Sequence, residues 1–170
     1  MEIFQVQITG GEALTHPELG YIIAQLIDRG IIISVSTSGM LLNDKISEDL
    51  KGLKNVAGSS IKVSLDGNEK THNFIRQDIR SYKNAVEFVK KMKKEEIPCQ
   101  IGTTVVDQSK EELEKLVSLV KELGVQSINI GMICSQGCAK ENEIKTSLSP
   151  LDLNKFLHNL KEILSKQGKL

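Results

Sequence analysis

The chain has 170 residues, of which 39% are apolar and 26% charged, so it is long enough for one domain with a hydrophobic core. Its 22 basic and 22 acidic residues give a formal net charge of +0, which offers no electrostatic basis for binding nucleic acid or an anionic membrane. Its three cysteines are too few for a disulfide framework, and no apolar run reaches the roughly 20 residues of a membrane span. We therefore expect a cytoplasmic protein with no nucleic-acid or membrane partner.

Strand and helix patterns alternate along the chain in five units. Short alternating or β-branched segments predict strands, and longer segments with apolar residues three or four positions apart predict helices. Pro17 and Gly30 mark the two ends of the first expected helix, and Ser109 with Glu112 forms a capping box at the start of another. In chain order, we expect strands over residues 3–9, 31–37, 60–65, 99–106 and 126–132, and helices that begin at Pro17, at Asn43 or Asp44, at Ser81, at Ser109 and at Ser149.

This alternation predicts an α/β fold in which a parallel sheet carries its helices outside. It does not by itself separate an open doubly wound sheet from an arc of a barrel, and five units are too few to close an eight-stranded barrel. We expect residues 1–170 to form one domain, with a long polar loop over residues 133–148 and a final helix over residues 149–167.

Glycine, hydroxyl and carboxylate residues gather where the expected strands end. The carboxyl ends of parallel strands meet at one rim, which is where ligands bind in α/β folds. A single turn of this composition is common between a strand and a helix. Several of them on one rim predict a binding site for a small polar ligand that carries hydroxyl groups and at least one positively charged group. The sequence has neither GxxxxGK[ST] nor GxGxxG, so we do not expect a nucleotide triphosphatase or a dinucleotide-dependent dehydrogenase. The residues concerned are Gly10-Gly11-Glu12, Thr37-Ser38, Ser64, Asp66 and Thr103-Thr104.

Three stretches together resemble the radical S-adenosylmethionine (SAM) family, especially members that make cofactors or modify peptides. They are Thr9-Gly10-Gly11-Glu12, Ser36-Thr37-Ser38-Gly39, and Ser64-Leu65-Asp66-Gly67 followed by His72 and Arg76. The resemblance covers residues 5–106 and extends more weakly to residue 150. It implies a partial TIM-type barrel in which the five strands correspond to strands two to six of a six-stranded barrel.

The resemblance also implies roles for single residues in binding SAM. Gly10 and Gly11 would offer carbonyl groups to the methionine ammonium, and Glu12 would offer a carboxylate or brace the turn. Arg76 would reach the methionine carboxylate. Ser64 would contact the ligand.

Three further rim residues have roles that the resemblance leaves less defined. Asp66 would hold its turn or approach the ribose, and Thr37 and Ser38 would form a polar turn near the ligand. Ordinary alternatives stay open, because Glu12 could cap the next helix and Arg76 could be a surface cation. We expect His72 to be a structural hydrogen-bonding residue, and we assign no catalytic residue and no metal ligand.

The sequence departs from the family most clearly in its cysteines. Cys99, Cys134 and Cys138 do not form the CxxxCxxC motif that holds the family's [4Fe-4S] cluster, and Ala13 and Ser38 replace a common proline and asparagine. We therefore expect a truncated core fragment that holds no cluster. The resemblance implies that the parent protein has SAM, the cluster and a cysteine-rich C-terminal extension.

The resemblance implies that the parent is an oxidoreductase or transferase that cleaves SAM reductively to a 5′-deoxyadenosyl radical and modifies a cofactor or a peptide. Its substrate would be a small molecule or a peptide, and its electron donor a ferredoxin or flavodoxin. We expect the fragment itself to be inactive and to dimerise, if at all, through an exposed sheet edge. Two alternatives stay open: an unrelated α/β-barrel hydrolase or aldolase that uses Glu12, Asp66 and His72, and a non-catalytic interaction domain.

Overall fold

The structure is a computed structural model, and it describes residues 3–105, 109–125, 127–132 and 150–167. The expected loop over residues 133–148 and the cysteines Cys134 and Cys138 lie outside these described residues. Within them, no helix is both long enough and apolar enough to cross a membrane.

Five strands form a single parallel sheet. Their order in the sheet is their order in the chain, from β1 at one edge to β5 at the other. A doubly wound sheet reverses its strand order in the middle, so this unbroken order identifies an arc of a barrel and confirms the predicted fold class. The strands are β1 (Gln5–Ile8), β2 (Ile32–Thr37), β3 (Ser60–Ser64), β4 (Cys99–Val105) and β5 (Ile128–Met132).

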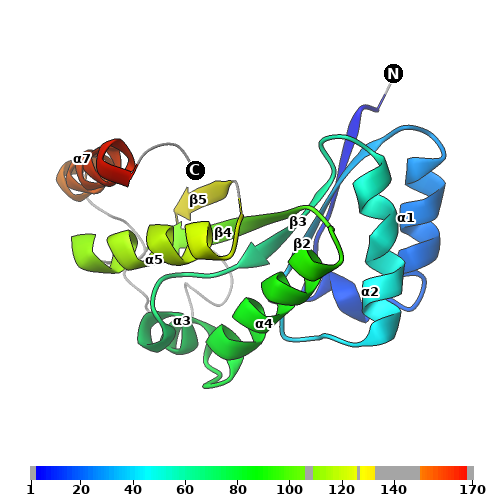
Figure 1. Ribbon diagram of the computed structural model, residues 1–170, viewed down its shortest axis with the longest axis horizontal. Coiled ribbons are helices and arrows are strands. Elements are labelled where there is room, and N and C mark those ends of the chain that lie inside the picture. The colour runs from blue at the N-terminus through cyan, green and yellow to red at the C-terminus, as the bar shows by residue number, and fades with distance from the viewer. Residues whose placement is uncertain (1–2, 106–108, 126, 133–149, 168–170) are drawn as a thin grey trace.

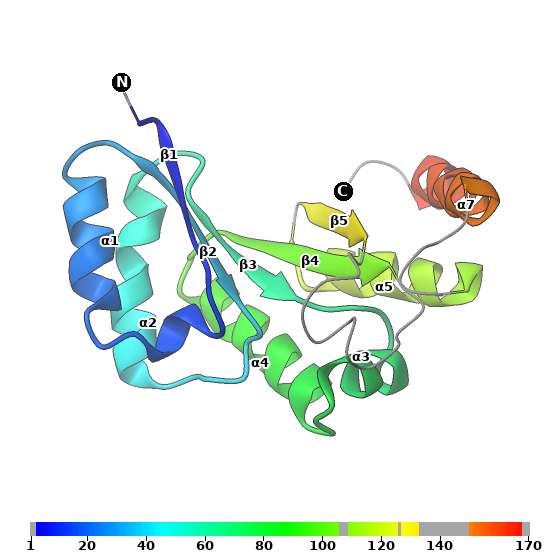
Figure 2. The ribbon, with the colours of Figure 1, turned by 180° about the vertical axis from the view of Figure 1, so that it is seen from behind.

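The connections between strands are helical and run around the outside of the fanned sheet (Figure 1), as the view from behind also shows (Figure 2). Ser109 and Glu112 form the predicted capping box at the start of α5. The helices are α1 (Leu19–Ile27), α2 (Asp44–Leu50), α3 (Glu69–Arg76), α4 (Ser81–Lys94), α5 (Lys110–Glu122) and α7 (Pro150–Gln167), with short 3₁₀ turns η1 (Ala13–Thr15) and η2 (Lys51–Asn55).

The two faces of the sheet differ in chemistry. On the outer face, alternate residues of the central strands are fully buried under the helices, as at Val35, Val63 and Ile101. The residues between them face the inside of the arc and are only partly buried, as at Ser36 and Lys62. The hydrophobic core therefore lies between sheet and helices, and the inner face is left polar.

Two elements differ from the sequence prediction. The first helix begins at Leu19, two residues after Pro17, with Glu18 as its N-cap residue. Helix α3 was not predicted, because its eight residues bury only His72 and so show no apolar repeat. The Asn68 side chain caps it by accepting a hydrogen bond from the Thr71 amide.

Candidate functional site

The turn after β1 is held by the carboxylate of Glu12. Its Oε1 atom accepts a hydrogen bond from the Leu14 amide at 3.1 Å, which caps η1. Its Oε2 atom accepts two hydrogen bonds from Ser38, from the amide at 2.9 Å and from the hydroxyl at 2.6 Å. Glu12 and Ser38 thus join the ends of β1 and β2, and the Glu12 carboxylate both caps η1 and braces the two turns.

The two glycines before Glu12 leave their backbone accessible. No heavy atom lies within 4 Å of the position that a Cβ would take at Gly10 or at Gly11. A ligand can therefore approach the main chain there, which is the use that glycine has at binding turns.

The turn after β2 packs against α4. The Thr37 hydroxyl accepts a hydrogen bond from the Gly39 amide at 3.0 Å, and the Thr37 side chain is buried on the helix side of the sheet. Gly39 has φ +74°, and a Cβ there would lie 3.0 Å from the Cα of Ala85. Thr37 therefore supports this turn from the helix side of the sheet and does not face the inside of the arc.

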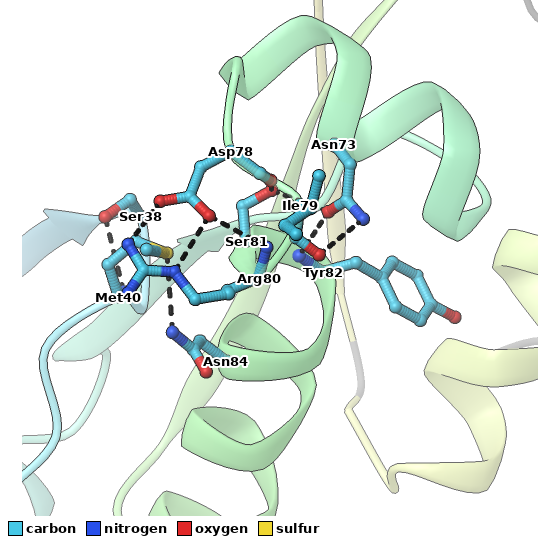
Figure 3. Close-up of polar contacts among 9 residues, drawn as sticks. All are labelled: Ser38, Met40, Asn73, Asp78, Ile79, Arg80, Ser81, Tyr82 and Asn84. Atoms are coloured by element: carbon cyan, nitrogen blue, oxygen red, sulfur yellow. Dashed lines mark hydrogen bonds and ion pairs between the residues drawn. The ribbon is translucent and has the colours of Figure 1, made fainter.

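The segment between α3 and α4 is fastened to the rim by two asparagines (Figure 3). Asn73 donates to the carbonyl of Ile79 and accepts from the Ser81 hydroxyl and the Tyr82 amide, all within 2.8–2.9 Å. Asn84 on α4 donates to the sulfur of Met40 at 3.6 Å (Figure 3). Asn73 thus ties α3 to the start of α4, and Asn84 joins α4 to the turn after β2.

Asp66 is the centre of a buried polar network at the end of β3. It is 0% exposed, and its Oδ1 atom accepts a hydrogen bond from the Thr104 amide at 2.8 Å. Its Oδ2 atom accepts from Nε and Nη2 of Arg76, at 2.8 and 2.7 Å. Burial alone would raise the pKa of Asp66, but the contacts with His72, Arg76 and Thr104 together hold it below its usual value.

His72 supports the same turn from α3. It is fully buried, its Nδ1 atom accepts a hydrogen bond from the Asp66 amide at 3.0 Å, and its ring meets the Tyr82 ring edge-on at 6.2 Å. His72 is placed as the structural hydrogen-bonding residue that the sequence predicts.

A cavity of about 490 Å³ lies on the inner face of the sheet. Two of the predicted site residues, Ser64 and Arg76, line this cavity. Thr9 also lines it, so the cavity wall reaches the residue before Gly10. The other predicted residues, from Gly10 to Asp66, shape the rim turns around it. The cavity wall also includes Gln7, Ser36, Lys62, Thr104 and Asn129.

Most of these additional wall residues were missed because the sequence analysis considered strand ends alone. A usable signal was present within the strands, where polar residues alternate with apolar ones, as at Ser34 and Ser36 or Lys62 and Ser64. Strands of a parallel sheet covered on both faces read as continuous apolar runs. The alternation therefore marks a polar inner face.

The residues around the cavity suit the groups of SAM. Carbonyl groups at Gly10 and Gly11 can accept from an ammonium, and the guanidinium of Arg76 can donate to a carboxylate. Among the described contacts, Arg76 uses Nε and Nη2 for Asp66, and its side chain is 32% exposed, so Nη1 is left for a ligand.

The described residues do not fit an iron–sulfur cluster. Within the described part of the chain, no three histidine, cysteine or acidic residues are grouped to hold a metal ion. Cys99 stands at the first residue of β4, away from the rim, and burial raises the pKa of its thiol to about 12. Such a thiol stays protonated and is a poor metal ligand.

Known proteins match both the sequence and the fold. The radical SAM superfamily profile matches residues 2–120. The AdoMet-dependent heme synthase of Methanosarcina barkeri is 31% identical over 165 residues, which is 96% of this chain and 45% of that protein. The sporulation killing factor maturation protein SkfB of Bacillus subtilis is 26% identical over 142 residues, 82% of this chain and 33% of that protein.

Solved structures show the same architecture. The crystal structure of Streptococcus suis SuiB matches with a TM-score of 0.78 at 16% identity, covering 97% of this chain and 37% of SuiB. SuiB bound to its precursor peptide SuiA and SuiB bound to SAM match with TM-scores of 0.77 and 0.75. The chain spans less than half the length of the heme synthase, SkfB and SuiB. The profile match over most of its residues, together with the shared fold, shows that this chain belongs to the radical SAM superfamily.

Proposed function

We propose that this chain forms the SAM-binding part of an enzyme that cleaves SAM reductively to modify a cofactor or a peptide. The observation that carries the proposal is the meeting of Ser64 and Arg76 in one cavity, beside the open main chain of Gly10 and Gly11. These residues come from separate stretches of the chain, and the fold brings them to one rim. Membership of the superfamily supports the same function.

Each residue has a role that its geometry supports. Gly10 and Gly11 accept hydrogen bonds from the methionine ammonium, and Nη1 of Arg76 donates to the methionine carboxylate. Ser64 offers a hydroxyl from the inner face of β3. Glu12 and Asp66 are positioning residues, because every contact described above for their carboxylates is made to the protein.

SAM supplies the chemistry when it is bound: after one-electron reduction it yields a 5′-deoxyadenosyl radical that takes a hydrogen atom from the substrate. The protein binds SAM and holds it in one orientation. We propose that the ligands of the cluster lie outside the described residues. The electron donor would be a separate protein such as ferredoxin or flavodoxin. The chain alone should bind SAM weakly and be inactive, since its three cysteines do not form CxxxCxxC.

The matched relatives are consistent with two substrate classes, a cofactor precursor or a peptide. One relative is a heme synthase, and two others are a maturation protein and SuiB, which has been crystallised with a precursor peptide. A hydrolase or aldolase that uses Glu12, Asp66 and His72 is not supported, because Asp66 and His72 are fully buried and the chain is a radical SAM protein.

The test is SAM cleavage by the full-length protein after anaerobic reconstitution with iron and sulfide and reduction with dithionite. We expect release of methionine and 5′-deoxyadenosine, reduced at least about tenfold by Ser64→Ala and by Arg76→Gln. Arg29→Gln is the matched control, because Arg29 bonds the Gln25 carbonyl on the exposed side of the fold. A reconstituted protein that carries the cluster but releases neither product would refute the proposal.

A further inference from the structure

A lysine stands in the middle of the polar inner face. Lys62 belongs to β3, the third of the five strands in sheet order, and it lines the cavity. It pairs in register with Ser36 on β2 and with Gln100 on β4. Paired residues of a parallel sheet point to the same face, so a hydroxyl side chain and an amide side chain flank Lys62 on this face.

Gly102 makes room for the Lys62 side chain. A Cβ at Gly102 would lie 3.2 Å from Cγ of Lys62 and 3.3 Å from Cδ, so the lysine stem lies directly over this glycine. Gly102 pairs in register with Ser64, two residues farther along β3 than Lys62. The stem therefore leans across β4 and toward the carboxyl ends of the strands, where the rim residues stand.

The charge of Lys62 is not matched by the protein in the part of the chain that the structure describes. Of the two carboxylates nearest the rim, Glu12 bonds Ser38 and Leu14, and Asp66 bonds Arg76 and Thr104. Apart from Arg76, which is paired with Asp66, the other polar side chains of the wall are neutral. Two of them, Gln7 and Asn129, donate their amide hydrogens to Ser36 and Gln100. A cation held on a concave surface without a partner is suited to an anionic ligand.

We propose that Lys62 binds a carboxylate group of the substrate, so that the enzyme acts on carboxylate-bearing molecules. This inference rests on the proposed function and narrows it to a substrate class. The backbone of Lys62 lies about 6–7 Å before Ser64 along the strand, at 3.3 Å per residue. Its side chain extends over Gly102, which is in register with Ser64, and lines the same cavity as Ser64 and Arg76. The cavity of about 490 Å³ falls within the range of roughly 300–1,000 Å³ typical of small-molecule sites.

The methionine end of SAM also carries a carboxylate. Experiment must therefore distinguish the carboxylate of SAM from a carboxylate of the substrate as the partner of Lys62. The probe is glutarate, with its neutral isostere glutaramide as the chemical control, and binding to the full-length reconstituted protein is measured by calorimetry. We expect saturable binding of glutarate and not of glutaramide. Lys62→Gln should weaken glutarate binding at least about tenfold, and Lys62→Arg, which keeps the charge, should retain most of it.

Lys54→Gln is the matched control, because it removes one positive charge from an exposed position on η2 in the helix layer. Gly102→Ala provides a second variant that leaves the lysine in place: its methyl group would displace the lysine stem, and we expect glutarate to bind more weakly. Each variant is also measured for SAM affinity, which should fall by less than the affinity for glutarate falls.

Three results would overturn the inference. They are equal binding of glutarate and glutaramide, unchanged glutarate binding in Lys62→Gln, and a loss of SAM affinity in Lys62→Gln without loss of glutarate binding. The last result would assign Lys62 to the SAM carboxylate. Failure of the wild-type protein to release methionine would instead refute the proposed function and leave the glutarate result intact.

Discussion

Glu12 and Ser38 join the ends of two neighbouring strands through one carboxylate oxygen, which accepts both the amide and the hydroxyl of the serine. The other oxygen accepts the Leu14 amide, so donors surround this side chain. A carboxylate suits the position because both of its oxygens accept, whereas an amide presents its own donor to one of these groups.

Glu12→Gln is therefore expected to destabilise the fold by about 1.5–3 kcal/mol, the range for a hydrogen bond to a charged group. Urea unfolding of the variant and of Glu18→Gln measures this effect. Glu18 is a suitable control because its side chain makes no capping bond at the start of α1. Equal stability of Glu12→Gln and the wild type would show that the brace contributes nothing.

The ion pair between the buried Asp66 and the partly exposed Arg76 predicts a defined pH dependence of stability. The pKa of Asp66 is lowered from 3.8 in the folded protein, so its contribution is present above about pH 4 and is lost as the pH falls through the lower folded value. Asp66→Asn should cost about 2–3 kcal/mol near pH 7, and its deficit relative to the wild type should shrink near pH 3. Urea unfolding at both pH values tests this, and a deficit that does not change with pH would contradict the assignment.

Glu112 is expected to couple α3 to α5. Its Oε1 atom accepts hydrogen bonds from Asn68 at 2.6 Å and from Thr71, while its Oε2 atom closes the capping box with the Ser109 amide at 3.3 Å. Glu112→Gln should therefore speed amide exchange in both α3 and the first turn of α5, at a cost of about 1 kcal/mol. Hydrogen exchange read by mass spectrometry measures this, with Glu114→Gln as the control on the same helix. Faster exchange in α5 alone would show that the contact with α3 carries no stability.

Cys99 is expected to resist alkylation in the folded protein. Burial raises the pKa of its thiol to about 12, and the thiolate is the reactive form. Iodoacetamide near pH 8 should leave the peptide that contains Cys99 unmodified in native protein and modify it fully in urea, as read by mass spectrometry. Rapid modification of native protein would show that the start of β4 opens easily.

The sequence allowed the strands and the rim turns to be predicted, because short β-branched runs and clusters of glycine with acidic residues are local signals. Glu12 and Ser64 were recognised from such signals as rim residues, whereas Arg76 was singled out only through the resemblance to the radical SAM family. The partners of these residues were not, because the bond between Asp66 and Thr104 joins positions 38 residues apart and depends on the register of two strands. The role of Lys62 was hidden for the same reason, since Gly102 meets it only once β3 and β4 are paired.

The unbroken strand order has a consequence for how the chain folds as it is synthesised. Each strand finds its partner in the strand made just before it, so the sheet can grow one unit at a time as the polypeptide leaves the ribosome. None of the five described strands must wait for a distant segment, and no earlier pair among them must separate to admit a later one. The bond between Glu12 and Ser38 can form as soon as the second strand has emerged, so the first part of the rim is complete well before the last helix exists.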